Sequence, residues 1–192
     1  QLDMDKDAHL ALSANVAISD VDNAGRYFPL HTMSDNLVSY LNNSLLKGNI
    51  PDANIVWHGQ LNQFPYQDQS GIFQAGFNLK DGAFLFQPDW PAVDDLSLYA
   101  LFENAAMDIL VNKGNLLSVP ADGAHVYIPF MGKETTLRVE AKVGADADDA
   151  KEVIDNSPLK NSISPTLNVV QISGDIVSEL DLTIPLYEGG KA

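Results

Sequence analysis

The chain has 192 residues, of which 45% are hydrophobic and 19% are charged, so it holds enough apolar material for one large domain or two small ones. Its formal net charge of −15 argues against nucleic-acid partners and against binding to anionic membrane surfaces, because such a surface repels phosphates. The absence of cysteine excludes disulfides, thiolate nucleophiles and cysteine-ligated zinc. No run of about 18 apolar residues is present, so no segment of this sequence is predicted to span a bilayer.

Apolar and polar residues alternate along several segments, which predicts antiparallel strands with one dry and one wet face. In chain order, the clear cases are residues 10–18, 73–79, 137–143 and 170–184. Weaker strands are predicted at residues 53–61, 83–87, 95–102, 106–111 and 123–129. The expected fold class is mainly β with a few short helices, built on a many-stranded, strongly twisted antiparallel sheet.

Helical periodicity interrupts this pattern in two regions. In Asp35–Lys47, leucines recur every four residues from Leu37 to Leu45, and Gly48 follows as a predicted helix end. Two shorter helical segments are predicted at Asp146–Asp155 and Leu159–Ile163.

The chain also shows a loose internal repeat. A strand, an Asp-x-Ala tripeptide, helical turns and another strand occur in residues 10–61 and again in 135–185, with a β meander at 62–134 between them. We interpret residues 1–192 as a single portion of a repeated β body rather than as two domains. Because the sequence begins at Gln1 in the approach to a strand, we expect it to be an interior piece of a longer protein.

Motifs for catalysis and metal binding are missing from the sequence. The acidic clusters lack the glycine and terminal glutamate of a calcium loop, and the four histidines are scattered singly. No G-x-S-x-G motif occurs, and adjacent acids such as Asp94 and Asp95 point to opposite faces of a strand. The chain is therefore predicted to be no enzyme and to hold no cofactor and no metal.

Aromatic residues are concentrated between residues 73 and 102, around the segment Pro88-Asp-Trp90-Pro91. Because proline cannot donate to a strand ladder, this segment is predicted to be a hinge between strands, with Trp90 packed over it. The aromatic cluster has two interpretations at this point. It is either an ordinary β core or an apolar surface that receives a ligand.

Several short segments together resemble one family. They are Arg26-Tyr-Phe-Pro29, Phe64-Pro-Tyr66, Phe86-Gln-Pro-Asp-Trp-Pro91, Phe102-Glu-Asn104, Ser157-Pro-Leu-Lys160 and Ile172-Ser-Gly-Asp175. On these segments the chain resembles the YhdP family of AsmA-like proteins of Gram-negative bacteria. The resemblance spans most of the chain.

The resemblance implies an open groove, formed by the sheet, whose apolar inner face carries phospholipid between the inner and outer membranes of the cell envelope. It also implies a periplasmic location, with the parent protein anchored in the inner membrane. The expected partners are phospholipid acyl chains and, at both sheet edges, the rest of the parent chain. Any oligomer of the isolated chain is then expected to be an artefact of edge pairing.

Under this hypothesis the groove wall is predicted to consist of apolar residues on alternating strand positions: Leu12, Val16, Phe73, Phe77, Phe84, Phe86, Leu98, Phe102, Leu137, Val139, Ile172, Ile176 and Leu180. Trp90, Leu37 and Leu41 are predicted to cover the groove. The helix at 35–47 could plug the groove, line its rim or dock outside it.

Two alternatives remain at this point. The first is a β-sandwich that serves as a binding or scaffold module of a periplasmic or surface protein, with its dry face as the core. The second is a hydrolase of envelope polymer, which would need convergent carboxylates or a Ser-His pair that the sequence does not offer. Period-two alternation does not separate the groove from the sandwich.

Overall fold

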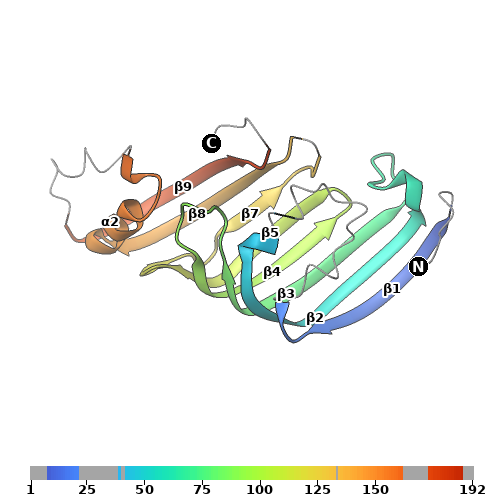
Figure 1. Ribbon diagram of the computed structural model, residues 1–192, viewed down its shortest axis with the longest axis horizontal. Helices are drawn as coiled ribbons and strands as arrows, with labels where there is room; N and C mark the ends of the chain where they lie inside the picture. Colours follow the sequence, from blue (N-terminus) through green and yellow to red (C-terminus); the bar gives the residue numbers. More distant parts are fainter. Residues whose placement is uncertain (1–7, 22–38, 40–41, 133, 162–172, 188–192) are drawn as a thin grey trace.

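A computed structural model describes residues 8–21, 39, 42–132, 134–161 and 173–187 (Figure 1). Its strands form one nine-stranded antiparallel sheet in the order β1-β2-β3-β4-β5-β7-β8-β9, with the short β6 paired to β5. The strands are β1 (His9–Ile18), β2 (Leu45–Gln60), β3 (Ile72–Phe84), β4 (Val93–Glu103), β5 (Ala106–Leu116), β6 (Val119–Pro120), β7 (His125–Ile128), β8 (Thr136–Asp146) and β9 (Asp175–Pro185). The predicted fold class, a mainly β chain with a many-stranded antiparallel sheet, is confirmed.

Several predicted strand boundaries are wrong. The strand predicted at 53–61 begins at Leu45. Residues 83–87 are not a separate strand, because β3 continues to Phe84 and the chain then turns. The strand predicted at 170–184 begins only at Asp175, because Gly174 has a φ of 90° and its carbonyl accepts a hydrogen bond from the Ala147 amide. Residues 170–172 lie outside the described residues.

The helix predicted at Asp35–Lys47 is wrong at its C-terminal end. Ser39 and residues 42–44 are helical, but β2 begins at Leu45, which pairs with Phe84. Gly48 is therefore inside a strand and does not end a helix. The strand partner on β3 overrides the leucine spacing, since helical periodicity is only a weak preference. Leu37 and Leu41 lie outside the described residues.

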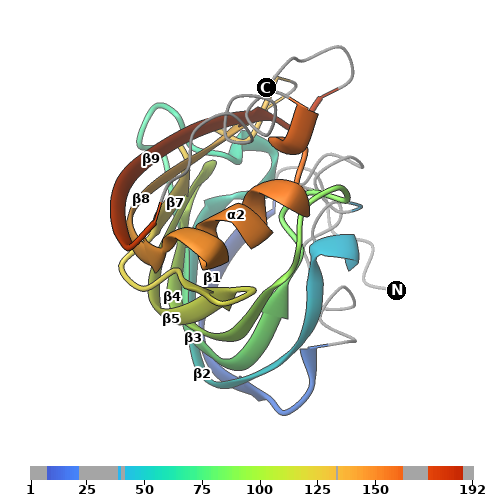
Figure 2. The ribbon, with the colours of Figure 1, turned by 90° about the vertical axis from the view of Figure 1, so that its left-hand side faces the viewer.

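The sheet bends where β2, β3 and β4 carry bulges side by side. The pairing register shifts between Asn49 and Asp52 in β2, and again near Asp81 in β3 and Asp95 in β4. Both aspartates have a φ of 51°. Bulges increase local twist and bend a strand, and the strands accordingly curve into an arch when viewed from the β9 edge (Figure 2).

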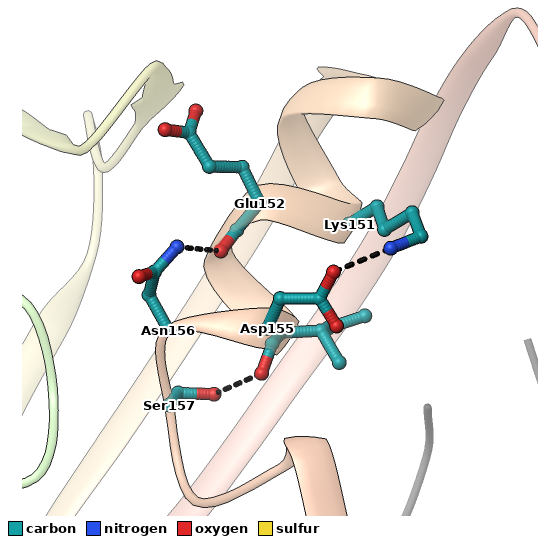
Figure 3. Close-up of polar contacts among 6 residues, drawn as sticks. Lys151, Glu152, Asp155, Asn156 and Ser157 are labelled. Atoms are coloured by element: carbon teal, nitrogen blue, oxygen red, sulfur yellow. Dashed lines mark hydrogen bonds and ion pairs between the residues drawn. The ribbon is translucent and has the colours of Figure 1, made fainter. Parts of the chain in front are cut away.

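Helix α2 (Ala147–Asp155) lies on the inner side of this arch (Figure 2). It confirms the helix predicted at Asp146–Asp155: the Asp146 carboxylate accepts a hydrogen bond from the Asp148 amide at 2.9 Å and caps the first turn. Figure 3 shows the other end of the helix, where Lys151 pairs with Asp155. There the Asn156 amide donates to the Glu152 carbonyl at 2.8 Å, so the last carbonyls have partners.

The core consists of two adjoining clusters. The larger lies on β2 to β5 and includes Leu79, Leu98 and Val111, and the smaller lies on β5, β7, β8 and β9. Ile128 and Leu137 of the smaller cluster are each only 1% exposed.

The β2–β3 connection is closed by an aromatic cluster around Tyr66. The short helix η2 (Leu61–Gln63) leads into Phe64. The ring of Tyr66 packs close to Gly59 and Gly71, and Tyr66 is only 2% exposed. The indole Nε1–H of Trp57 donates to the Tyr66 hydroxyl oxygen at 2.8 Å. A Cβ at Gly71 would lie 2.6 Å from the His58 carbonyl oxygen and 2.7 Å from the tyrosine ring, so the connection requires glycine there.

Candidate functional site

One face of the sheet carries an unbroken row of apolar residues across eight strands. Strand pairing places each of them directly opposite the next, in the order Val16, Ala53, Phe77, Ala100, Ile109, Val126, Val139 and Leu182. We call this set the central row, and the side of the sheet that carries it the apolar face. Seven strand spacings give the row a length of about 33 Å.

A second apolar row runs beside the central row. It contains Ala14, Ile55, Ala75, Phe102, Met107 and Ile128, again in directly opposed pairs, and Leu137 pairs with Ile184 farther along. On the other side of the central row lie Leu79, Leu98 and Val111. The apolar face is therefore several residues wide over most of its length.

The opposite face is mostly polar. The residues that follow or precede the central row by one position are Asn15, Asn54, Gly76, Leu101, Asp108, Tyr127, Arg138 and Thr183, and they too are directly opposed. We call this side the polar face. Here the His125 Nε2 lies 2.9 Å from an Asp108 oxygen, and the Tyr127 hydroxyl donates to Glu140 at 2.8 Å. The two faces thus differ in chemistry, and the polar face also carries exposed apolar residues such as Val56, Leu110 and Val177.

The central row is only partly covered. Ala53 and Ala100 are buried, whereas larger members such as Phe77 and Ile109 are half-buried. The described strands all belong to one sheet, so the sandwich alternative, which needs a second sheet over this face, is not favoured.

Charged side chains lie away from the central row. Lys47 faces Asp94 at 3.5 Å and Lys113 pairs with Asp95, and all four side chains are more than half exposed. The hydrogen bond from Lys113 to Asp95, together with the attraction of that carboxylate, raises the pKa of the lysine above its ordinary value of 10.5. These pairs sit near the bulges of β2 and β4.

Most of the residues predicted for the groove wall share the apolar face. Pairing places the following on it: Leu12, Val16, Phe73, Phe77, Leu98, Phe102, Leu137, Val139, Ile176 and Leu180. Phe84 packs against the larger core cluster, while Phe86 lies beyond the end of β3 and packs against the smaller one. Phe86 is thus not on a strand as predicted, because β3 ends two residues earlier. Ile172 lies outside the described residues.

The segment from Pro88 to Pro91 connects β3 and β4, outside both strands, as predicted. Trp90 packs against Phe86 with ring centroids 5.0 Å apart. Whether Trp90 covers a ligand as well as the turn stays a prediction.

The predicted groove wall omitted five members of the central row: Ala53, Ala100, Ile109, Val126 and Leu182. The first four lie in segments predicted only as weaker strands, and two of them are alanines, which are only weakly apolar. The signal that finds them is the strand register, which a single sequence does not contain.

Within the described residues, no group of three or more histidine and acidic side chains is placed to hold a metal ion. No described helix is long and apolar enough to cross a membrane.

The fold and its central row define a class: a single curved antiparallel sheet that presents one elongated apolar face. The chain belongs to the YhdP family, whose profile, described as YhdP protein, matches residues 1–192. It is 33% identical over 177 residues to the intermembrane phospholipid transporter YhdP of Escherichia coli strain K12. That match covers 92% of this chain and 14% of the relative. No solved structure matches the chain significantly.

Proposed function

We propose that this chain supplies a length of apolar track along which phospholipid acyl chains move between the inner and outer membranes. The observation that carries the proposal is the central row, which stays apolar across eight strands. The name of the Escherichia coli relative, an intermembrane phospholipid transporter, supports the choice of ligand.

The physics of acyl-chain binding fits such a row. Each CH₂ group removed from water contributes roughly 0.8 kcal/mol wherever it lies on an apolar surface. Successive members of the row, such as Phe77, Ala100 and Ile109, therefore offer similar binding energy. A tail can shift from one strand to the next without leaving a deep well, and the track needs no catalytic group.

The proposal includes a periplasmic location and an open continuation of the track. β1 and β9 form the two edges of the described sheet, and each leaves one side of its backbone without a strand partner within the described residues. Further strands of the same polypeptide, in a parent protein anchored in the inner membrane, would extend the row at these edges. Pairing between isolated chains at the same edges would then be an artefact.

Native mass spectrometry of the chain purified gently from a Gram-negative host tests the proposal. We expect co-purifying phospholipid. Ile109→Asp, which puts a charge in the central row, should abolish it, whereas Leu110→Asp should leave it unchanged. The two residues are adjacent, but Leu110 is 46% exposed and belongs to the polar face, which makes it a matched control.

A second, more conservative variant separates loss of lipid binding from loss of folding. Val139→Thr keeps the shape of the side chain while adding a hydroxyl to the central row, and it should lower lipid occupancy with an unchanged circular dichroism spectrum. A folded chain that takes up no added phospholipid, or one that keeps its lipid in Ile109→Asp, would contradict the proposal.

A further inference from the structure

The polar face carries a hollow of about 170 Å³ between β2, β3 and β4. Its polar lining comes from Asp52, Asn54, Gln74 and Asn78, and its apolar lining comes mainly from Val56, Leu101 and the ring of Tyr99. Pockets for complete small molecules usually measure about 300–1,000 Å³. This hollow therefore suits one ring of a larger ligand that presents both polar and apolar groups.

The tip of the Tyr99 ring lies over Gly76, which has no side chain to displace it. A Cβ at Gly76 would lie 2.7 Å from the Tyr99 hydroxyl oxygen and 3.5 Å from Cζ. Tyr99 is nevertheless 42% exposed, so a large part of the ring meets solvent. Its hydroxyl makes no hydrogen bond within the described part of the chain. The result is a partly exposed aromatic platform whose polar tip has no partner among the described residues.

Hydrogen bonds hold the amide and carboxylate groups around the platform in position, and these groups keep further hydrogen-bonding capacity. Asn15 donates to an oxygen of Asp52 at 2.7 Å and to the Asn54 side-chain oxygen at 3.2 Å. Gln74 donates to Glu103. Among the described residues, the second Asp52 oxygen, the Asn54 NH₂ group and the Gln74 oxygen have no further partner, and Asn78 makes no side-chain hydrogen bond.

We propose that this hollow binds one ring of a neutral oligosaccharide. A pyranose ring has an apolar C–H face that stacks on an aromatic ring, and a rim of hydroxyls that pair with amides and carboxylates. Asp52 and the net charge of −15 both disfavour an anionic ligand such as a nucleotide. Because the hollow is on the face opposite the central row, a bound glycan would leave the apolar track open.

A two-dimensional NMR titration of the chain with maltohexaose, and separately with chitohexaose, tests this inference. We expect shifts at residues 52–56, 74–78 and 99–101 with at least one of the two sugars, and a Kd in the millimolar range. Which sugar binds reports whether the preferred ring carries an N-acetyl group.

The matched variants are two glycine-to-alanine changes on the polar face. Gly76→Ala forces the flexible end of Tyr99 off its seat and should weaken binding by about fivefold or more. Gly144→Ala adds a methyl group in open space and should leave the affinity unchanged. Tyr99→Ala should abolish the shifts while phospholipid uptake persists, so failure of the glycan site and failure of the lipid track are distinguishable.

The inference is overturned if neither sugar shifts the named residues, or if Gly76→Ala and Tyr99→Ala bind as well as the unaltered chain. Self-association is a further contrary result. The inference is overturned if light scattering shows that two copies of the chain associate through the polar face and that added sugar does not separate them.

Discussion

Phe77 of β3 and Phe102 of β4 stack with ring centroids 6.1 Å apart and planes inclined by 17°. They are diagonal neighbours, because Phe77 pairs directly with Ala100 and Phe102 pairs directly with Ala75. Each ring thus lies opposite an alanine, whose small side chain leaves room for the stack. The stacked rings connect the central row to the second apolar row, so the apolar surface is continuous between the two rows at this point.

The stacking predicts an energetic coupling between the two rings. In a double-mutant cycle with alanine at both positions, we expect a coupling of about 0.5–1.5 kcal/mol in the free energy of unfolding, measured in urea. The pair Phe64 and Phe77 is the control and should be additive, since Phe64 packs on Trp57 and Phe73 at the start of β3, away from the stack. Additivity within about 0.3 kcal/mol for Phe77 and Phe102 would contradict the prediction.

The hydrogen bond inside the aromatic cluster at the β2–β3 connection gives a second prediction. Tyr66→Phe removes the acceptor of the Trp57 indole N–H and should lower the free energy of unfolding by about 1 kcal/mol. Tyr99→Phe removes a hydroxyl without a described partner and should change stability by less than about 0.5 kcal/mol. Equal effects of the two changes in thermal or urea unfolding would be the contrary result.

The packing of the smaller core cluster gives a third. Leu137 is almost fully buried, so Leu137→Ala should cost about 2–5 kcal/mol through lost transfer energy and the cavity that remains. Leu110→Ala, on the polar face, should cost less than about 1 kcal/mol. If urea unfolding gave the two variants the same stability, the assignment of the buried face would be wrong.

Acid sensitivity gives a fourth prediction. The pKa of Asp68 is lowered from its ordinary value of 3.8, chiefly by the Ser70 hydroxyl and then by the Ser70 amide, which both donate to its carboxylate. Because the folded pKa lies below the unfolded one, this stabilisation is present above pH 3.8 and is lost as pH falls through the folded value. Ser70→Ala should raise the Asp68 pKa measured by NMR, and an unchanged pKa would show that the Ser70 hydroxyl does not cause the shift.

The sequence predicted those elements whose local pattern agrees with the tertiary structure. Residues 73–79 and 137–143 alternate without interruption, and both lie in strands as expected. The helix after Asp146 could be predicted because the capping aspartate and the acidic first turn are local signals.

The errors cluster where local pattern and pairing disagree. Leucine spacing favoured a helix through Lys47, but β2 already pairs with β3 there, around a bulge that breaks the period of two. Phe86 continued the alternation of β3 by pattern, yet the chain had already turned towards Pro88.

Of the candidate site, the sequence predicted the face to which each residue belongs but not the row. A period of two says that Phe77 and Ile109 are each on a dry face. Only the register shows that Ala100 lies directly between them, so that an apolar line crosses the strands. The polar hollow was also beyond prediction, because it depends on Tyr99 lying over Gly76.

The central claim is that lipid tails run along the apolar face and not the polar one. The most direct measurement is photo-crosslinking in a Gram-negative host, with a photoreactive amino acid placed at one position at a time and the adducts identified by mass spectrometry. We predict phospholipid adducts at Phe77, Ile109 and Val139 and none at Asn78, Leu110 and Arg138. Equal adducts at both sets, or none at Ile109 in a folded chain, would contradict the account.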